Sequence, residues 1–312
     1  MEAGLEPAQH LVTALLNLAV ALLTGASVAR VRLGRDASGW AEARRAPVRQ
    51  AAIAGAAVAL LADAAWLWLK SAAIAEVPVT EAASASWSML SSTHLGFACG
   101  IGMAALLFAS AGALIGRGRS RGPALLSLGA LAVFWYTRSM VSHAASEGDF
   151  SLRLLADWGH LGLISLWIGE VMLAGGAILR TAGNLSAVRR QARAAYVASL
   201  SSSATLALAG IFLTGLYSAW RNLGGFGNLV GNSYGNTLVL KLALVGAAAI
   251  LGGINRFFVM PQWLARESAG SAASPLFPAR FRRILWVEAL LLLAAVVAAA
   301  WLAATAPPGE AM

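Results

Sequence analysis

The chain alternates long apolar runs with short polar breaks. A helix needs about 20 apolar residues to cross a bilayer, and within lipid only a helix or a closed barrel satisfies all of its backbone hydrogen bonds. The breaks contain glycine, proline, serine or arginine, which are typical of helix ends, as in GRGRSRGP at 116–123. The pattern predicts about eight transmembrane helices, at residues 8–29, 50–75, 86–115, 123–145, 153–179, 194–220, 237–258 and 284–305.

The composition supports a membrane protein. Hydrophobic residues make up 59% of the chain and charged residues 12%, whereas a soluble domain carries about 25% charged residues. We therefore predict an all-α, polytopic membrane helix bundle that forms a single transmembrane domain over residues 1–312. The formal net charge of +9 does not indicate nucleic-acid binding, because the basic residues lie in short loops between apolar runs.

The basic residues also predict an orientation. Eighteen of the 23 lysine and arginine residues lie in or beside the loops that follow the first, third, fifth and seventh predicted helices. Cytoplasmic loops carry such an excess, so we predict that these four loops face the cytoplasm. Both termini and the acidic loop with Glu147 and Asp149 would then face outside, which is the periplasm if the protein lies in a bacterial cytoplasmic (inner) membrane.

All four histidines fall near the outer side of this predicted topology. His10 begins the first helix, His143 ends the fourth, and His94 and His160 lie about two turns inside the third and fifth helices. Polar groups within membrane segments are costly and usually mark a functional site. Imidazole is a common metal ligand that suits copper, zinc and iron. Each histidine could instead be an interfacial residue bonded to a neighbour, an interpretation that fits His10 best.

Two neighbouring side chains favour a metal site. Met140 precedes His143 by three residues, and Asp157 precedes His160 by three. Each pair would share one face of a helix. Asp157 could bind a metal directly or orient an imidazole by accepting its other N–H.

The inner half of the predicted bundle offers fewer ligands. Cys99 and Met103 share a face of the third helix, and soft sulfur ligands suit Cu(I). His94 and Met103 are nine residues apart and therefore lie on opposite faces, so no ligand ladder runs down this helix. Glu170, near the middle of the membrane, and Glu288, near the inner end of the last helix, need partners there. Ion pairs and ion passage both fit these carboxyl groups.

Several segments match one family in order. They are SHAAS (142–146), DWGHLGLISLWIGE (157–170), TGLYSAW (214–220), SYGNTLVLKLAL (233–244), GGINRFF (252–258), and Glu288 before LLLAAVVAAAWLAATAPP. The chain thus resembles the CopD family of copper-resistance membrane proteins, in which an SHA element precedes a D-W-x-H-x(6)-W-x-G-G pattern. The resemblance is clearest over residues 130–308. Glu170 stands where the family pattern usually has a second glycine, and the first two predicted helices offer little to match.

The resemblance implies copper transport from periplasm to cytoplasm, in copper homeostasis or resistance, beside a periplasmic copper-binding partner of the CopC type. His143 matches the histidine of the SHA element. His160, Asp157 and Trp167 match the histidine, aspartate and tryptophan of the following pattern.

We therefore predict a copper site in the outer third of the membrane. His143 and His160 are its central ligands, His94 is the third, and Met140 or His10 completes the set. Asp157 and Trp167 would support the ligands. Three nitrogens can hold either Cu(I) or Cu(II).

Other functions remain open at this point. A protein that binds or senses copper without releasing it inward fits the same residues, because the inner candidates (Cys99, Met103, Glu170 and Glu288) are sparse. Paired histidines on neighbouring helices also hold b-type haem for electron transfer, here only on the outer side. A structural subunit without metal is a third possibility. No ATP-binding glycine loop, CxxC metal motif or CxxCH haem motif occurs, so we predict no enzyme activity.

Overall fold

The computed structural model describes residues 5–179, 186–268, 276–305 and 308. Its α-helices are α1 (Glu6–Arg35), α2 (Gly39–Ile74), α3 (Ala82–Ser92), α4 (His94–Ile115), α5 (Gly122–Met140), α6 (Leu152–Leu173), α7 (Ala187–Leu223), α8 (Ser233–Ile254), α9 (Met260–Ser268) and α10 (Leu276–Ala304). Two π-helical turns, Ala174–Ile178 and Asn255–Val259, extend α6 and α8. No strand occurs among the described residues, which confirms the predicted all-α class.

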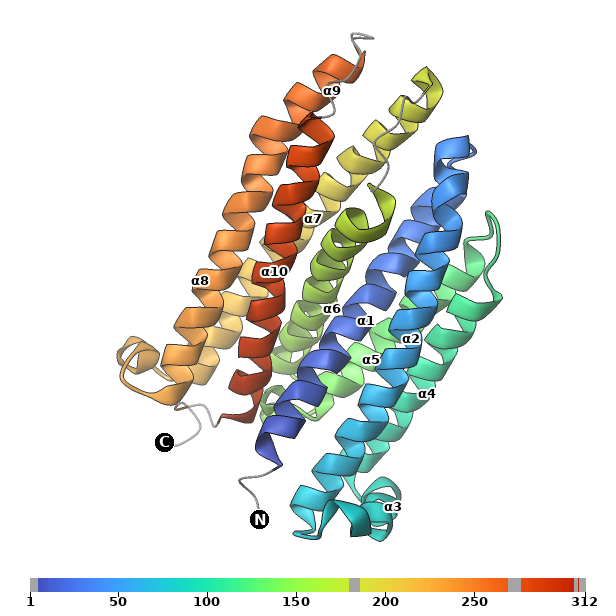
Figure 1. Ribbon diagram of the computed structural model, residues 1–312. Coiled ribbons are helices and arrows are strands. Elements are labelled where there is room, and N and C mark those ends of the chain that lie inside the picture. The colour runs from blue at the N-terminus through green and yellow to red at the C-terminus, as the bar shows by residue number, and fades with distance from the viewer. Residues whose placement is uncertain (1–4, 180–185, 269–275, 306–307, 309–312) are drawn as a thin grey trace.

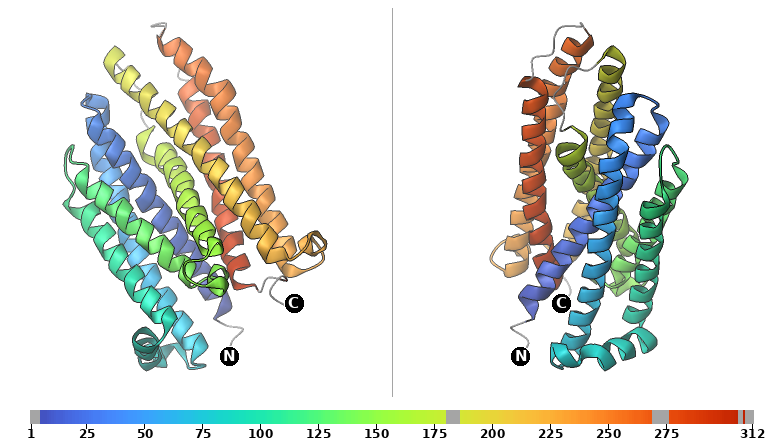
Figure 2. Two further views of the ribbon diagram at one scale, coloured as in Figure 1. Left: turned by 180° about the vertical axis from the view of Figure 1, so that it is seen from behind. Right: turned by 45° about the vertical axis from the view of Figure 1, so that its right-hand side comes forward.

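The long helices run up and down beside one another in a single bundle (Figure 1). In this bundle α1 packs against α2, α6 and α10, α4 packs against α5, α6 against α7, and α8 against α10. The two further views show the same neighbours, with α1 beginning and α10 ending at the same end of the bundle (Figure 2). An even number of passes follows from this arrangement.

Seven of the described helical segments are long and apolar enough to cross a membrane. The helix α5, with 19 residues, is long enough but not apolar enough, and its last turn holds Thr137, Arg138 and Ser139. It nevertheless lies beside α4 and α6 along the bundle (Figures 1 and 2). With α5 counted, the chain makes the eight predicted passes.

Two predicted helices end elsewhere than expected. The predicted helix 86–115 is wrong, because Thr93 leaves the helical conformation and caps α4 by accepting a hydrogen bond from the Gly96 backbone N–H. The short helix α3 therefore lies at the end of the bundle (Figure 1). His94 begins α4 instead of lying about two turns inside a helix.

The predicted helix 123–145 is also too long. The helix α5 ends at Met140, and His143 begins a separate 3-10 turn, His143–Glu147. Ser142 caps this turn by accepting the Ala144 backbone N–H, 3.1 Å away. Met140 and His143 therefore do not share a helix face, contrary to the prediction.

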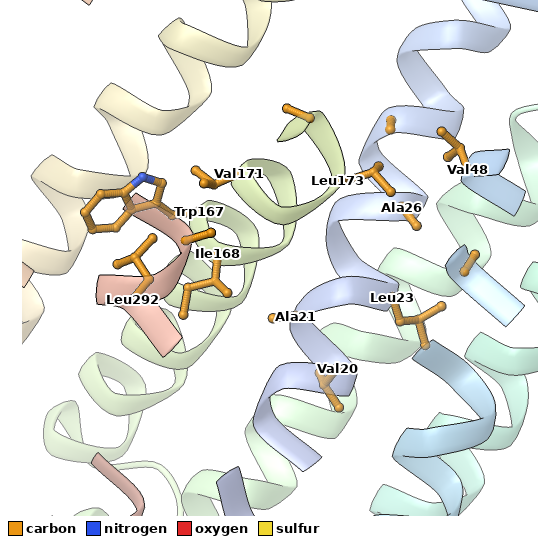
Figure 3. Packing of buried hydrophobic residues seen from close by; sticks show 14 of the residues in the cluster. Val20, Ala21, Leu23, Ala26, Val48, Trp167, Ile168, Val171, Leu173 and Leu292 are labelled. Carbon is orange, nitrogen blue, oxygen red and sulfur yellow. The ribbon is translucent and has the colours of Figure 1, made fainter. Parts of the chain in front are cut away.

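The closest approach in the core joins α1 and α6. A Cβ atom added at Gly25 would lie 2.2 Å from the Gly169 carbonyl carbon, and one added at Gly169 would lie 1.8 Å from the Ala21 oxygen. The two backbones can touch only because both positions are glycine. In Figure 3, Leu173 of α6 points toward α1, whereas Trp167 points away from it, toward the side where Leu292 of α10 lies.

The two ends of the bundle carry different side chains. We call the end that holds His10, His94 and His143 the histidine end, and the opposite end, with the turns after α1, α4, α6 and α8, the arginine end (Figure 1). Arginines there donate hydrogen bonds to carbonyl groups in the last turns of helices.

The arginine contacts at that end link different helices. Arg30 Nη1 donates to Gly112 O (3.1 Å), and Arg44 Nε donates to Ile178 O (3.2 Å). Arg180, another basic residue of the loop after the fifth predicted helix, lies outside the described residues.

Candidate metal site at the histidine end

The two histidine-bearing sequence segments meet through Asp157. Its Oδ2 accepts a hydrogen bond from Ser139 Oγ at the end of α5 (2.7 Å), and Ser142 Oγ lies 3.2 Å from the same oxygen. Ser142 directly precedes His143, and Asp157 lies one helical turn before His160. The carboxylate therefore fixes the His143 turn against the first half of α6.

His160 lies against α7. Its Nδ1 is 2.9 Å from Thr214 Oγ1, and that hydroxyl also lies 2.7 Å from Gly210 O. A carbonyl oxygen can only accept a hydrogen bond, so the single hydroxyl hydrogen of Thr214 is donated to Gly210 O. The Thr214 oxygen then accepts from the imidazole, which places the proton of His160 on Nδ1. A Cβ atom at Gly215 would lie 3.1 Å from Cε1 of the ring, so this glycine lets the imidazole pack closely on α7. The lone pair of Nε2 is then the one that a metal can use.

Lys241 of α8 adds a positive charge to this region. It lies close enough to act electrostatically on both Asp157 and His160. The described structure therefore places a carboxylate, an imidazole and an ammonium group near one another inside the bundle. Lys241 is one of the five basic residues outside the arginine-rich loops. An ionisable residue in an apolar run is itself a signal of a site.

The acidic loop forms pairs within the protein. Asp149 Oδ2 lies 2.7 Å from His94 Nε2, which joins the loop to the start of α4. Glu147 pairs with Arg221 at the end of α7 and lies 3.9 Å from Arg153 Nη1. Acidic residues attract cations, and these two arginines partly offset that attraction in this loop.

His10, Met140 and His143 are the remaining outer candidates. The His10 ring stacks on Trp301 of α10, with ring centroids 4.4 Å apart. Met140 is the last residue of α5, and both it and His143 are half-buried. Within the part of the chain that the structure describes, no group of three or more His, Cys, Asp and Glu side chains is close enough to hold a metal ion. The structure thus brings the predicted residues to one end but does not bring them together as a closed ligand set.

The sequence predicted that Trp167 supports the histidine ligands. The structure instead places it away from the histidines. Its Nε1–H donates to Glu288 Oε1 of α10, 2.9 Å away. The two family-pattern residues therefore contact each other, although they are far apart in sequence. Glu288 lies well inside α10 instead of near its end.

Glu170 is a buried partner of two other helices. It forms an ion pair with Arg32 of α1 and accepts a hydrogen bond from Ser203 Oγ of α7. Cys99 and Met103 are half-buried on α4. Cys99 lies within electrostatic reach of Asp63 and Arg138, so the inner candidates are spread over separate parts of the bundle.

The fold and its buried ionisable groups define a multi-pass helical membrane protein. A family model described as copper resistance protein D-like, N-terminal domain, matches residues 4–152, and one described as copper resistance protein D matches residues 194–302. Together they cover most of the chain, so the protein belongs to the CopD family of copper-resistance membrane proteins. No curated protein and no solved structure matches the chain.

The matched ranges refine the resemblance seen in the sequence. The first range includes the two helices for which sequence analysis found little to match. His143 lies within it, and Thr214, Lys241 and Glu288 lie within the second range. The segment 153–193, with Asp157, His160 and Trp167, lies between the two.

Proposed function

We propose that this protein binds copper at the histidine end and transports it across the bacterial cytoplasmic membrane, from periplasm to cytoplasm. Copper is the substrate, and its handling serves copper homeostasis or resistance. Membership of the CopD family supports copper as the ion. The bundle of apolar helices supports passage through a bilayer.

The contact between the Ser142 turn and Asp157 is the observation that carries this proposal. It holds the His143 turn, which follows α5, against the His160 segment of α6. The spacing of the two segments in the sequence does not by itself require this contact. Thr214 orients His160 through Nδ1, and a metal-binding imidazole is usually held in this way through its second nitrogen. These features favour Nε2 of His160 as a copper ligand.

The proposed ligands are His143 and His160, with His94 as the third and Met140 or His10 completing the set. Asp149 of the acidic loop contacts Nε2 of His94. To bind copper through this nitrogen, His94 would exchange Asp149 for the metal. Nitrogen ligands bind both Cu(I) and Cu(II), so either oxidation state fits the outer site.

The proposed direction rests on the charge distribution. The arginine end would face the cytoplasm, and the histidine end, with both termini, would face the periplasm. A periplasmic partner of the CopC type would deliver copper to the histidines. Cys99, Met103, Glu170 and Glu288 are the residues available for an inward route.

Metal content and the visible spectrum of one purified sample, before and after copper loading, test the outer site. We expect bound copper without a Soret band, lost sharply in His143→Ala and His160→Ala because each removes a ligand. Cys99→Ala should keep this copper and serves as the control. Unchanged copper in both histidine variants would refute the site. A Soret band that His143→Ala abolishes would instead assign the histidines to b-type haem.

A further inference from the structure

Two of the carboxyl groups buried in the bundle, Glu170 and Glu288, differ in their partners. Glu170 is 1% exposed and pairs with Arg32. Glu288 is 2% exposed and accepts a hydrogen bond from the Trp167 indole. Among the described residues Glu288 forms no ion pair. A buried carboxylate without a positive partner is costly, so Glu288 suits a site that a cation occupies for part of the time.

Glu288 lines a cavity of about 210 Å³ between α6, α7, the end of α8 and α10. Asn255 and Met260 line the same cavity. Asn255 is 4% exposed, and its Oδ1 accepts no hydrogen bond. Buried amide oxygens are normally bonded, so this oxygen is a second group in the cavity that lacks a partner.

The irregular end of α8 places these groups. The π-turn Asn255–Val259 interrupts the regular helix before Met260, and such turns are often found at functional sites. Asn255 Nδ2 donates to Phe281 O of α10, 3.2 Å away, which fixes the amide and leaves Oδ1 as its free acceptor. A Cβ atom at Gly252 would lie 3.4 Å from Glu288 Oε1, so the carboxyl group lies directly against α8.

We propose that this cavity is an inner binding site for Cu(I), with Glu288, Asn255 and Met260 as its ligands. The inference rests on the proposed copper transport and assigns its inward step to this cavity. The thioether of Met260 is a soft ligand that favours Cu(I). The carboxylate and one Cu(I) ion form a neutral pair, which removes the cost of the unpaired charge.

Arg256 also lines the cavity, and its charge opposes a cation. Its Nη1 donates to Ser201 Oγ of α7, 2.6 Å away, and its guanidinium carbon lies 5.8 Å from the centre of the Phe257 ring. These contacts hold the guanidinium against the wall formed by α7 and α8. The Glu288 carboxylate, Oδ1 of Asn255 and the Met260 thioether then remain for the ion.

Cu(I) binding to the purified full-length protein, measured in competition with the chelator bicinchoninate, tests this site. Glu288→Gln keeps an acceptor for the Trp167 N–H, and Met260→Leu keeps the side-chain volume. We expect each variant to bind one of its Cu(I) ions about tenfold or more weakly, the magnitude typical of an impaired metal site. Copper uptake into proteoliposomes should fall in parallel.

Matched controls come from elsewhere in the chain. Met172→Leu replaces a partly buried methionine on α6, and Glu42→Gln removes an exposed carboxylate. Both should bind Cu(I) as the parent protein does. Unchanged Cu(I) affinity and uptake in both Glu288→Gln and Met260→Leu would overturn the inner site. Loss of copper binding in His143→Ala alone would then leave the outer site standing, so the two proposals can fail separately.

Discussion

At the residue scale, hydrogen-bond partners decide what each polar side chain can do. His160 and His94 are both imidazoles at the histidine end, yet Thr214 holds one and Asp149 the other. The Thr214 hydroxyl bonds to Nδ1 of His160, so a metal would bind this ring through Nε2. Asp149 contacts Nε2 of His94, so His94 must give up this contact to bind a metal through that nitrogen.

Thr214→Val should weaken copper binding at the outer site. Valine has nearly the same shape but cannot accept the Nδ1–H, so His160 loses the bond that orients it. We expect an affinity about 10- to 100-fold lower, the usual effect of losing a group that orients a ligand. Copper titration of the purified protein measures it.

Thr237→Val is the matched control, because the Thr237 hydroxyl bonds to Ser233 O of its own helix (2.8 Å). It should leave copper affinity unchanged. Equal affinities for the Thr214 and Thr237 variants would show that Thr214 does not orient a copper ligand.

At the scale of elements, one turn of α6 makes three different contacts. Trp167 bonds to Glu288 of α10, Gly169 touches the backbone of α1, and Glu170 pairs with Arg32. The glycine of the W-x-G pattern is therefore explained by packing. Glu170, which departs from the family pattern, has gained a partner on α1.

Gly169→Ala should destabilise the bundle. The added methyl would overlap the Ala21 carbonyl of α1, so the two helices must separate, which costs about 3 kcal/mol or more for an overpacked core. Thermal unfolding in detergent should show a lower Tm.

Gly100→Ala is the control for this substitution, since a Cβ atom at Gly100 of α4 has no neighbour within 4 Å. Its Tm should equal or exceed that of the parent, because alanine favours a helix. A Gly169→Ala protein as stable as the Gly100→Ala protein would contradict the close packing of α1 and α6.

The element boundaries show where hydropathy alone misleads. Residues 86–115 form one largely apolar stretch, and its length predicts a single helix. The Ser91, Ser92 and Thr93 cluster was the available signal of a break. In the structure Thr93 caps α4 by accepting the Gly96 backbone N–H, so a new helix begins at His94. His94 is exposed there.

At the scale of the whole molecule, most of the described arginines lie at the end of the bundle opposite the histidines (Figure 1). The even number of passes puts both termini with the histidines. An inward copper path would therefore run from the histidine end toward the cavity at Glu288, which lies in the half of the bundle nearer the arginine end.

Cysteine labelling of intact cells tests the proposed orientation. In a Cys99→Ser background, a cysteine at Ser92, exposed at the histidine end, should react with a membrane-impermeant maleimide. A cysteine at Ser120, exposed in the turn between α4 and α5, should react only after the cells are opened. The reverse pattern would place the histidines in the cytoplasm and overturn the proposed direction.

The sequence by itself determined the membrane bundle, the alternation of arginine-rich turns and the gathering of the histidines at one end. These features follow from hydropathy and charge, which act on each segment independently of its neighbours. Only the tertiary structure decided the partners: Trp167 with Glu288, 121 positions apart, and Arg32 with Glu170. Such pairs depend on which helices adjoin and on how each helix is rotated, and a periodic apolar pattern does not specify either.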